Sequence, residues 1–78
     1  MNQNNYYKLL GLELDYQIDK NLLLINYRQL QRSIHPDNFA NHSDRDKLLS
    51  VQKSAQINDA YQIIKDPLKR AIYHLSLL

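Results

Sequence analysis

The stretch R-S-I-H-P-D-N-F, at residues 32–39, places two chemically capable side chains close together. An imidazole, His35, and a carboxylate, Asp37, are separated only by Pro36. Because a proline ends a helix and keeps the residue before it out of the helical conformation, we expect both side chains on an exposed loop. Such a pair can serve in acid–base catalysis, bind a metal, dock a partner, or form a turn in which Asp37 bonds its own backbone.

Catalysis and metal binding are both disfavoured by the surrounding sequence. A catalytic His–Asp pair needs a nucleophile or substrate beside the imidazole, and Ser33 and Ser43 are the nearby hydroxyls. A chain of 78 residues, however, has little room for an enclosed cleft. A structural zinc needs four ligands, and the chain offers only His35, His42 and His74, with no cysteine. We therefore expect no enzymatic activity, no cofactor and no metal site.

The composition indicates one small helical domain. Apolar residues make up 44% of the chain and charged residues 23%, with one glycine and two prolines. Since sheets need turn residues, this scarcity favours a few long helices. The net charge of +2 is too small to indicate nucleic acid or a membrane by itself, and no apolar run is long enough for a membrane span. The start, MNQNNYYK, lacks the features of a secretory signal, so we expect a soluble chain that is not secreted.

Capping residues, breakers and apolar spacing predict four helices. Gly11 is expected to end the first helix, and Pro36 and Pro67 break the chain. The two long helices should form an antiparallel hairpin, with a short helix at each end closing its open face. The expected helices are residues 4–10 (capped by Asn4 or Asn5), 19–34 (starting at Asp19), 44 to about 65 (capped by Ser43 or Asp44) and 67–77 (capped by Asp66), with a connector at 12–18 and a polar loop at 35–43.

Each helix is expected to bury one apolar stripe. Arg28 and Arg32 lie roughly opposite the stripe of the second helix and, with Lys20, give that helix an exposed basic side. The predicted inward residues are Leu23, Tyr27, Leu30 and Ile34 in the second helix; Leu48, Val51, Ala55 and Asn58, broadened by Leu49, Ile57, Ala60, Tyr61 and Ile64, in the third; and Leu68, Ile72 and Leu75 in the fourth.

The exposed basic side leaves more than one kind of partner open. A basic helical hairpin can lie on nucleic-acid phosphates, although acidic residues are scattered along the chain and no aromatic cluster accompanies the arginines. An acidic protein surface fits as well, with charge steering the encounter and the loop setting the register. The plainest interpretation of Arg28 and Arg32 is a solvated helix face, and that of His35 to Asp37 is a turn that stops a helix. The residues alone indicate a four-helix binding module.

Four blocks of the sequence resemble the J-domain (DnaJ-like) family of co-chaperones, whose signature is His-Pro-Asp between two antiparallel helices. Here the signature is His35, Pro36 and Asp37, preceded by Y-R-Q-L-Q-R-S-I. Y-Y-K-L-L-G-L resembles the first helix of the family, and I-N-D-A-Y-Q-I-I-K-D-P-L-K-R-A-I-Y its third and fourth. S-V-Q-K-S-A-Q-I-N-D-A-Y and D-P-L-K-R-A-I-Y-H-L-S-L resemble, more narrowly, the HscB J-proteins of iron–sulfur cluster assembly. The resemblance implies an all-α J-domain over residues 1–78.

The resemblance also implies a function and a set of contact residues. The domain would bind an Hsp70-type chaperone, HscA-like or DnaK-like, and stimulate its ATPase in iron–sulfur cluster assembly or, alternatively, in general protein folding. Phe39 would anchor the loop. Asn38 differs from the basic residue that many J-domains carry there, and Gln29 and Ser33 thin the basic side, which would weaken attraction to an acidic Hsp70 surface. The implied Hsp70-binding residues are His35, Pro36, Asp37, Tyr27, Arg28 and Arg32.

The family also suggests what surrounds this domain. In HscB proteins a helical C-terminal domain follows the J-domain and holds the iron–sulfur scaffold protein. The chain ends at Leu78, where that domain would begin, so we expect it to be missing and the scaffold not to be bound. We expect a monomer that acts in the bacterial cytoplasm, or in the mitochondrial matrix if the source is eukaryotic.

Overall fold

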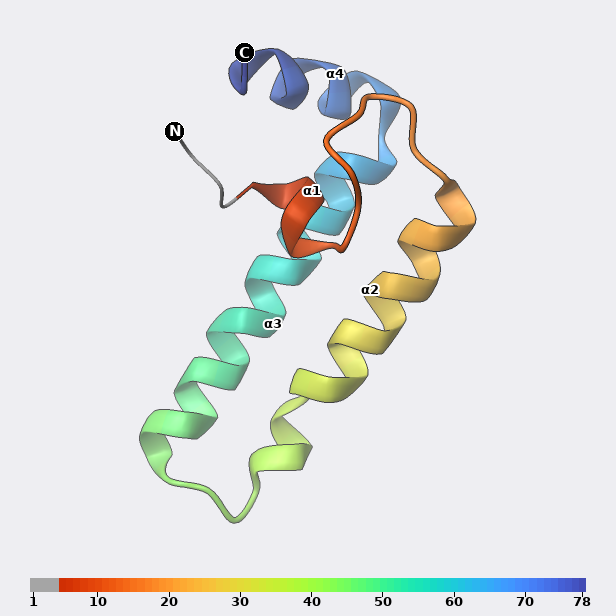
Figure 1. The fold of residues 1–78 in the computed structure, drawn as a ribbon. Helices are drawn as coiled ribbons and strands as arrows, with labels where there is room; N and C mark the ends of the chain where they lie inside the picture. The colour runs from red at the N-terminus through yellow and green to blue at the C-terminus, as the bar shows by residue number, and fades with distance from the viewer. Residues whose placement is uncertain (1–4) are drawn as a thin grey trace.

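The chain folds into helices, and the computed structural model describes residues 5–78, in which no strand occurs. Figure 1 shows two long helices as an antiparallel hairpin, with the two short helices together at the end away from the hairpin turn. The predicted all-α class and hairpin are confirmed, and none of the described helices is long and apolar enough to cross a membrane. The elements are α1 (Tyr6–Leu9), α2 (Lys20–Ile34), the 3-10 helix η1 (Pro36–Phe39), α3 (Asp44–Lys65) and α4 (Pro67–Ser76).

Every α-helix begins at a polar residue whose side-chain oxygen accepts backbone N–H groups of the first turn. At Asp66, the bonds donated by the N–H groups of Lys69 and Leu68 hold the pKa of the carboxyl below its usual range. Of the other predicted caps, Asn4 lies outside the described residues, and Asp44 is the first residue of α3. The observed caps are Asn5, Asp19, Ser43 and Asp66.

The first helix is a single turn, shorter than the predicted span of residues 4–10. Gly11 follows it with a φ of 69°, the left-handed conformation expected at that position. The connector then runs to Asp19, and the side chain of Tyr16 ties it to α4 by donating a hydrogen bond to the Pro67 carbonyl at 3.1 Å. One glycine therefore lets the chain leave α1 and cross to the start of α2.

The core lies between the hairpin and α1. The predicted inward stripe of α2 is confirmed, because Leu23 is buried and Tyr27, Leu30 and Ile34 pack against the core. Arg28 and Arg32 are exposed, as expected. The fully buried apolar residues are Tyr7, Leu10, Leu23, Ile57, Ala60 and Ile64.

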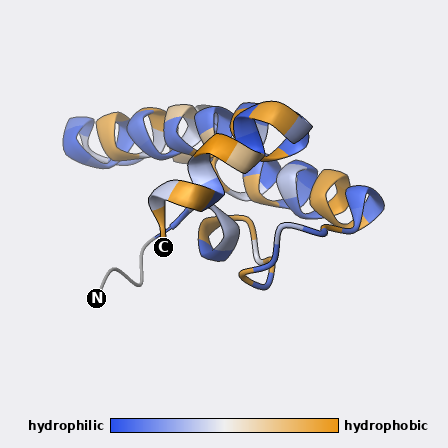
Figure 2. Cartoon of the chain, turned by 90° about the horizontal axis from the view of Figure 1, so that it is seen from above, coloured by the Kyte–Doolittle hydropathy of each residue, from blue (hydrophilic) through white to orange (hydrophobic). Residues whose placement is uncertain are grey.

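The inward face of α3 differs from the predicted one along most of the helix. Leu48 and Val51 were expected inside but are 57% and 50% exposed, and Leu49, Ala55 and Asn58 are also exposed. Apolar residues occur around this helix, and Figure 2 shows them spread along the ribbons, so their spacing does not single out one face. Contact with α2 selects the face instead. The residues of α3 that are buried are Ser50, Ile57, Ala60 and Ile64.

The inward face of α4 was predicted wrongly. Leu68, Ile72 and Leu75 are 70%, 63% and 69% exposed, whereas Arg70 is only 6% exposed. The Arg70 guanidinium donates to the Ile64 carbonyl at 2.7 Å, which satisfies the end of α3, and lies 4.7 Å from the centre of the Tyr16 ring. A buried arginine on this side turns the leucine face of α4 outward.

Aromatic side chains join α1 and the connector to α4. Tyr6 stacks on Tyr73 with 4.6 Å between ring centres, and the Tyr7 hydroxyl lies 3.0 Å from His74 Nδ1. The ring of Tyr16 meets the edge of His74 as well. We call this part of the molecule the aromatic end and the opposite part, residues 35–43, the loop end. The aromatic end consists of Tyr6, Tyr7, Tyr16, Arg70, Tyr73 and His74.

Candidate functional site

The backbone leaves helical conformation at His35, as the following proline requires. His35 has φ −56° and ψ 135°, and Pro36 then opens the 3-10 turn η1 within the predicted polar loop. The His35 Nδ1 atom accepts a hydrogen bond from the Asp37 N–H at 3.2 Å. This bond needs a Nδ1 without a proton, so the neutral ring must carry its proton on Nε2. Within this chain, the His35 side chain therefore caps the N-terminus of η1.

The carboxylate of Asp37 is the most accessible charge of the loop. Its side chain is 92% exposed, and Oδ2 lies 3.6 Å from His35 Nδ1, while the His35 side chain is 58% exposed. Because Nδ1 of the neutral ring already accepts the Asp37 N–H, it has no proton to share with this carboxylate, and the two groups do not form an ion pair. The loop thus fixes the backbone of Asp37 and leaves its carboxylate available to a partner.

Neither nearby hydroxyl is directed at His35. The Ser33 hydroxyl donates to the Leu30 carbonyl at 2.9 Å, and the Ser43 oxygen accepts the Asp46 N–H as the cap of α3. Among residues 5–78 no group of three or more His, Cys, Asp or Glu side chains is placed to hold a metal ion. His35 and Asp37 therefore lie on an exposed turn.

Phe39 is half-buried at the end of η1. Its ring is 5.0 Å from that of His42, centre to centre, and His42 Nδ1 lies 3.6 Å from a carboxylate oxygen of Asp46 in the first turn of α3. These contacts are compatible with the expected role of Phe39 as an anchor for the loop.

Tyr27 links the basic side of α2 to α3. Its ring stacks on Tyr61 with 4.0 Å between centres and an angle of 17°, and its hydroxyl donates to Asn58 Oδ1 at 3.0 Å. Lys65 lies over the other ring, 5.3 Å from the centre of Tyr61. Tyr27, a predicted inward residue of α2, is half-buried.

A polar pair holds α2 against α3 closer to the loop. The Gln31 amide donates to the Ser54 carbonyl at 3.0 Å, and the Ser54 hydroxyl donates back to Gln31 Oε1 at 2.7 Å. No signal in the sequence indicated this pair, because a glutamine and a serine on two helices resemble ordinary surface residues until the register between the helices is known. Tyr61 and Asn58, on the same side, had likewise been interpreted only as inward residues of α3.

The structure brings the predicted residues together in part. His35 and Asp37 lie side by side in one turn, and Tyr27, Arg28 and Arg32 belong to the helix that leads into it. Both arginines are exposed. We call this set, with Pro36, the predicted docking face: His35, Pro36, Asp37, Tyr27, Arg28 and Arg32.

Comparison with known proteins finds relatives for nearly the whole chain. The family model described as DnaJ domain matches residues 5–74. The chain is 56% identical over 73 residues to a "Co-chaperone protein HscB homolog" of Vibrio cholerae, covering 94% of this chain and 43% of that protein. A homologue from Aliivibrio fischeri is 54% identical over 72 residues, covering 92% of this chain and 42% of that protein.

Solved structures agree. "Chaperone HscB from Vibrio cholerae" superposes with a TM-score of 0.91 at 55% identity, covering 95% of this chain and 45% of that chain. The human co-chaperone protein HscB superposes with a TM-score of 0.90 at 36% identity, covering 96% and 38%. The chain therefore spans less than half the length of these relatives.

Proposed function

This chain belongs to the DnaJ domain family, and on that premise we propose that it binds an Hsp70-type chaperone and stimulates its ATPase. Its relatives are named co-chaperones, so the chemistry is proposed to take place in the partner. A domain that binds one state of a chaperone more tightly shifts the chaperone toward that state. The predicted docking face is the surface through which this chain would act.

One observation carries the proposal: the exposed Asp37 carboxylate is presented on a turn whose backbone is already bonded. Asp37 would pair with a cationic group of the chaperone, while His35, by accepting the Asp37 N–H at 3.2 Å, would hold the turn in the bound shape. Arg28 and Arg32 would attract acidic side chains from a distance and so raise the association rate. Tyr27, held by Tyr61, would give that side of α2 a rigid surface.

The test is single-turnover ATP hydrolysis by an Hsp70 with and without this domain. We expect wild-type chain to accelerate hydrolysis, and Asp37→Asn and His35→Gln to abolish the acceleration. Both residues are exposed, so the free energy of unfolding should change by less than about 0.5 kcal/mol. Circular dichroism during thermal unfolding measures that change.

A matched control is Asp59→Asn, the same chemical change at an exposed residue of α3 outside the predicted docking face. We expect this variant to stimulate as wild type does. If Asp37→Asn and His35→Gln also stimulated normally, the loop would have no part in docking.

The finer proposal is that the chaperone system serves iron–sulfur cluster assembly, as the resemblance to HscB proteins suggests. Contact with the cluster scaffold protein would belong to a part of those relatives that this chain does not span. Isothermal titration of this chain with such a scaffold should give no detectable heat of binding. Tight binding would place the scaffold contact on this domain instead.

The alternative is a general protein-folding co-chaperone. Stimulation of an HscA-like chaperone at a lower domain concentration than a DnaK-like chaperone would favour the iron–sulfur role, and the reverse order would favour the alternative. We propose that the domain acts as a monomer in the bacterial cytoplasm. The higher identity to a Vibrio relative (56%) than to the human one (36%) supports the bacterial source in this proposal.

A further inference from the structure

The C-terminal end of α2 is capped by the side chain of Asn38, the residue that follows His35, Pro36 and Asp37. We call these three residues the docking loop. A helix end leaves four carbonyls without partners inside the helix. The Asn38 side-chain amide donates to the Arg32 carbonyl at 2.7 Å and to the Ser33 carbonyl at 3.3 Å. Two of the four carbonyls thus gain a donor from a residue that follows the His-Pro-Asp sequence.

The backbone of Asn38 bonds in the same place. Its N–H donates to the His35 carbonyl at 2.9 Å, while the His35 ring accepts the Asp37 N–H. Residues 35–37 therefore lie between the last turn of α2 and Asn38. Asn38 is bonded to that turn by its side chain and to His35 by its backbone N–H. The exposed carboxylate of Asp37 projects from a loop whose two ends are joined by one residue.

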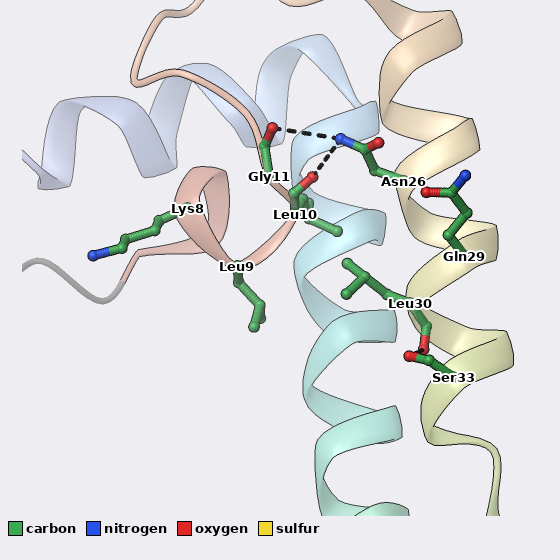
Figure 3. Close-up of a pocket in the computed structure, with 8 residues that line it drawn as sticks. All are labelled: Lys8, Leu9, Leu10, Gly11, Asn26, Gln29, Leu30 and Ser33. Carbon is green, nitrogen blue, oxygen red and sulfur yellow. Dashed lines mark hydrogen bonds between the residues drawn. The ribbon is translucent and has the colours of Figure 1, made fainter. Parts of the chain in front are cut away.

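The same arrangement occurs a second time in this chain, at the end of α1. Figure 3 shows the Asn26 side-chain amide reaching the carbonyls of Leu10 and Gly11, at 2.9 and 3.4 Å. There the amide joins two segments that are 15 and 16 residues apart. In both places one asparagine amide spans two successive carbonyls at a helix end, which indicates that the contact of Asn38 is a means of fixing the chain.

Only some side chains can make this contact. A carboxylate in place of the amide would face two carbonyl oxygens at the negative end of the helix dipole, and alanine would leave the carbonyls to water. The amide has the required donor on a short side chain, so it fixes the loop at a small cost in side-chain entropy.

We propose that Asn38 is a positioning residue for the docking loop. By donating hydrogen bonds to the carbonyls at the end of α2, it keeps His35, Pro36 and Asp37 in the geometry that binds the chaperone. This inference rests on the proposed function. If the loop is in the binding geometry only part of the time, the apparent dissociation constant is the intrinsic one divided by that fraction of time, while the bound complex is unchanged. Asn38 therefore sets the concentration at which the domain acts and leaves the maximal stimulation alone.

The first experiment uses the free domain and needs no partner. In two-dimensional NMR spectra of Asn38→Ala and Asn38→Asp, the backbone amide signals of residues 33–38 should move, while those of α3 and α4 stay in place. The backbone N–H at position 38 should exchange with water several-fold faster. If the spectra over residues 33–38 were unchanged, the proposal that the Asn38 side chain orders this loop would be wrong.

The second experiment titrates an Hsp70 with each variant and measures ATP hydrolysis. Loss of one neutral hydrogen bond corresponds to a factor of about five at most in the equilibrium of the loop, so Asn38→Ala should raise the half-maximal concentration by about two- to five-fold with the same maximal rate. Asn38→Asp should raise it further. The matched control is Asn41→Asp, the same change at an exposed residue of the same loop, which should behave as wild type.

The possible outcomes are distinct. If only Asn38→Asp, and not Asn38→Ala, raised the half-maximal concentration, the effect would come from the added charge, and the positioning role would be wrong. A lower maximal rate would mean that Asn38 touches the chaperone itself. If the wild-type domain did not stimulate ATP hydrolysis by the Hsp70, the proposed function would be wrong. The NMR experiment would still decide whether the Asn38 side chain is bonded to the end of α2.

Discussion

The two ends of the hairpin are held by different kinds of contact. At the aromatic end, bonds join residues 67 positions apart, such as the Tyr6 N–H with the Tyr73 hydroxyl and the Tyr7 hydroxyl with His74. At the loop end, the hydrogen bonds around His35, Pro36 and Asp37 join residues two to six positions apart. The aromatic end is buried or half-buried, and the loop end is mostly exposed.

This difference separates stability from recognition. Contacts between distant parts of the chain bury surface and exist only when the whole domain is folded, so they stabilise the fold. Contacts within a short loop order a few residues and add little to global stability, yet they determine how Asp37 is presented. Changes at the aromatic end should therefore unfold the domain, and changes at the loop end should alter binding in a domain that stays folded.

The strongest test of this comparison is Tyr7→Ala, set against Phe39→Ala at the loop end. Tyr7 is fully buried, so its removal should lower the free energy of unfolding by about 3–5 kcal/mol, the usual range for a buried aromatic side chain. A domain of this size has only about 5–10 kcal/mol in total. Urea titration followed by circular dichroism measures both variants. Equal losses would show that the two ends do not differ in stability.

The two asparagine amides give a closer comparison. Asn26→Ala leaves the carbonyls of Leu10 and Gly11 without a donor in a partly buried place, which should cost about 1–2 kcal/mol of unfolding free energy. Asn38→Ala does the same in an exposed loop, where water can replace the amide, and should cost less than about 0.5 kcal/mol. Thermal unfolding of both variants decides this, and a larger loss for Asn38 would contradict the division of roles.

The hydroxyl of Tyr7 should make the aromatic end sensitive to alkali. Burial raises the pKa of Tyr7 above its usual 10.0. Above pH 10 the unfolded chain therefore releases this proton before the folded one does, and stability falls as the pH rises. Tyr7→Phe removes this contribution, together with about 1 kcal/mol from the bond with His74 at neutral pH. Urea titrations at pH 7 and above pH 10 should show a smaller alkaline loss for the variant than for wild type.

The smallest effect on stability is expected on the basic side of α2. Arg28→Gln and Arg32→Gln, combined, should change the free energy of unfolding by less than about 0.5 kcal/mol, since both side chains are exposed. The same double variant should bind the chaperone with a lower association rate and a weaker dependence on salt. Stopped-flow binding at two ionic strengths measures both. An unchanged salt dependence would remove these arginines from the docking face.

Much of the fold could be predicted because its signals are local. Asp19, Asp66 and Gly11 mark helix ends by chemistry that acts within a few residues, and Pro36 forces His35 out of the helix. The stripe of α2 was also predictable, because Leu23, Tyr27, Leu30 and Ile34 repeat on one side along the whole helix, although Leu22 and Ile25 lie outside it and are exposed. In α3 apolar residues occupy several sides, so Leu48 and Val51 were placed inside although they are exposed. In α4 Leu68, Ile72 and Leu75 do share one face, but that face points outward because the inward side carries Arg70 and Tyr73.

Within the candidate site, the sequence indicated the chemical groups and the structure supplied their supports. The tripeptide and the two arginines were recognisable from type and spacing. The pairing of Tyr27 with Tyr61 and of Gln31 with Ser54 depends on the register between two helices, which no single segment specifies. The hydrogen bonds of Asn38 were unexpected as well: the sequence showed only a departure from the family pattern, whereas in the structure the Asn38 amide is bonded to the end of α2.

The sequence by itself determined where the helices begin and end, that they form a hairpin with His35 and Asp37 exposed at its turn, and the family to which the chain belongs. The helix ends and the exposed turn follow from capping, proline chemistry and periodicity, which act over one or two helical turns, whereas the family was indicated by the resemblance of four sequence blocks. Only the tertiary structure decided which face of α3 and α4 is buried, that Arg70 lies inside while the leucines of α4 lie outside, and which side chains brace the docking loop. Those choices depend on how distant segments pack together, because the free energy of burial is shared among all of them and belongs to no single stretch of chain.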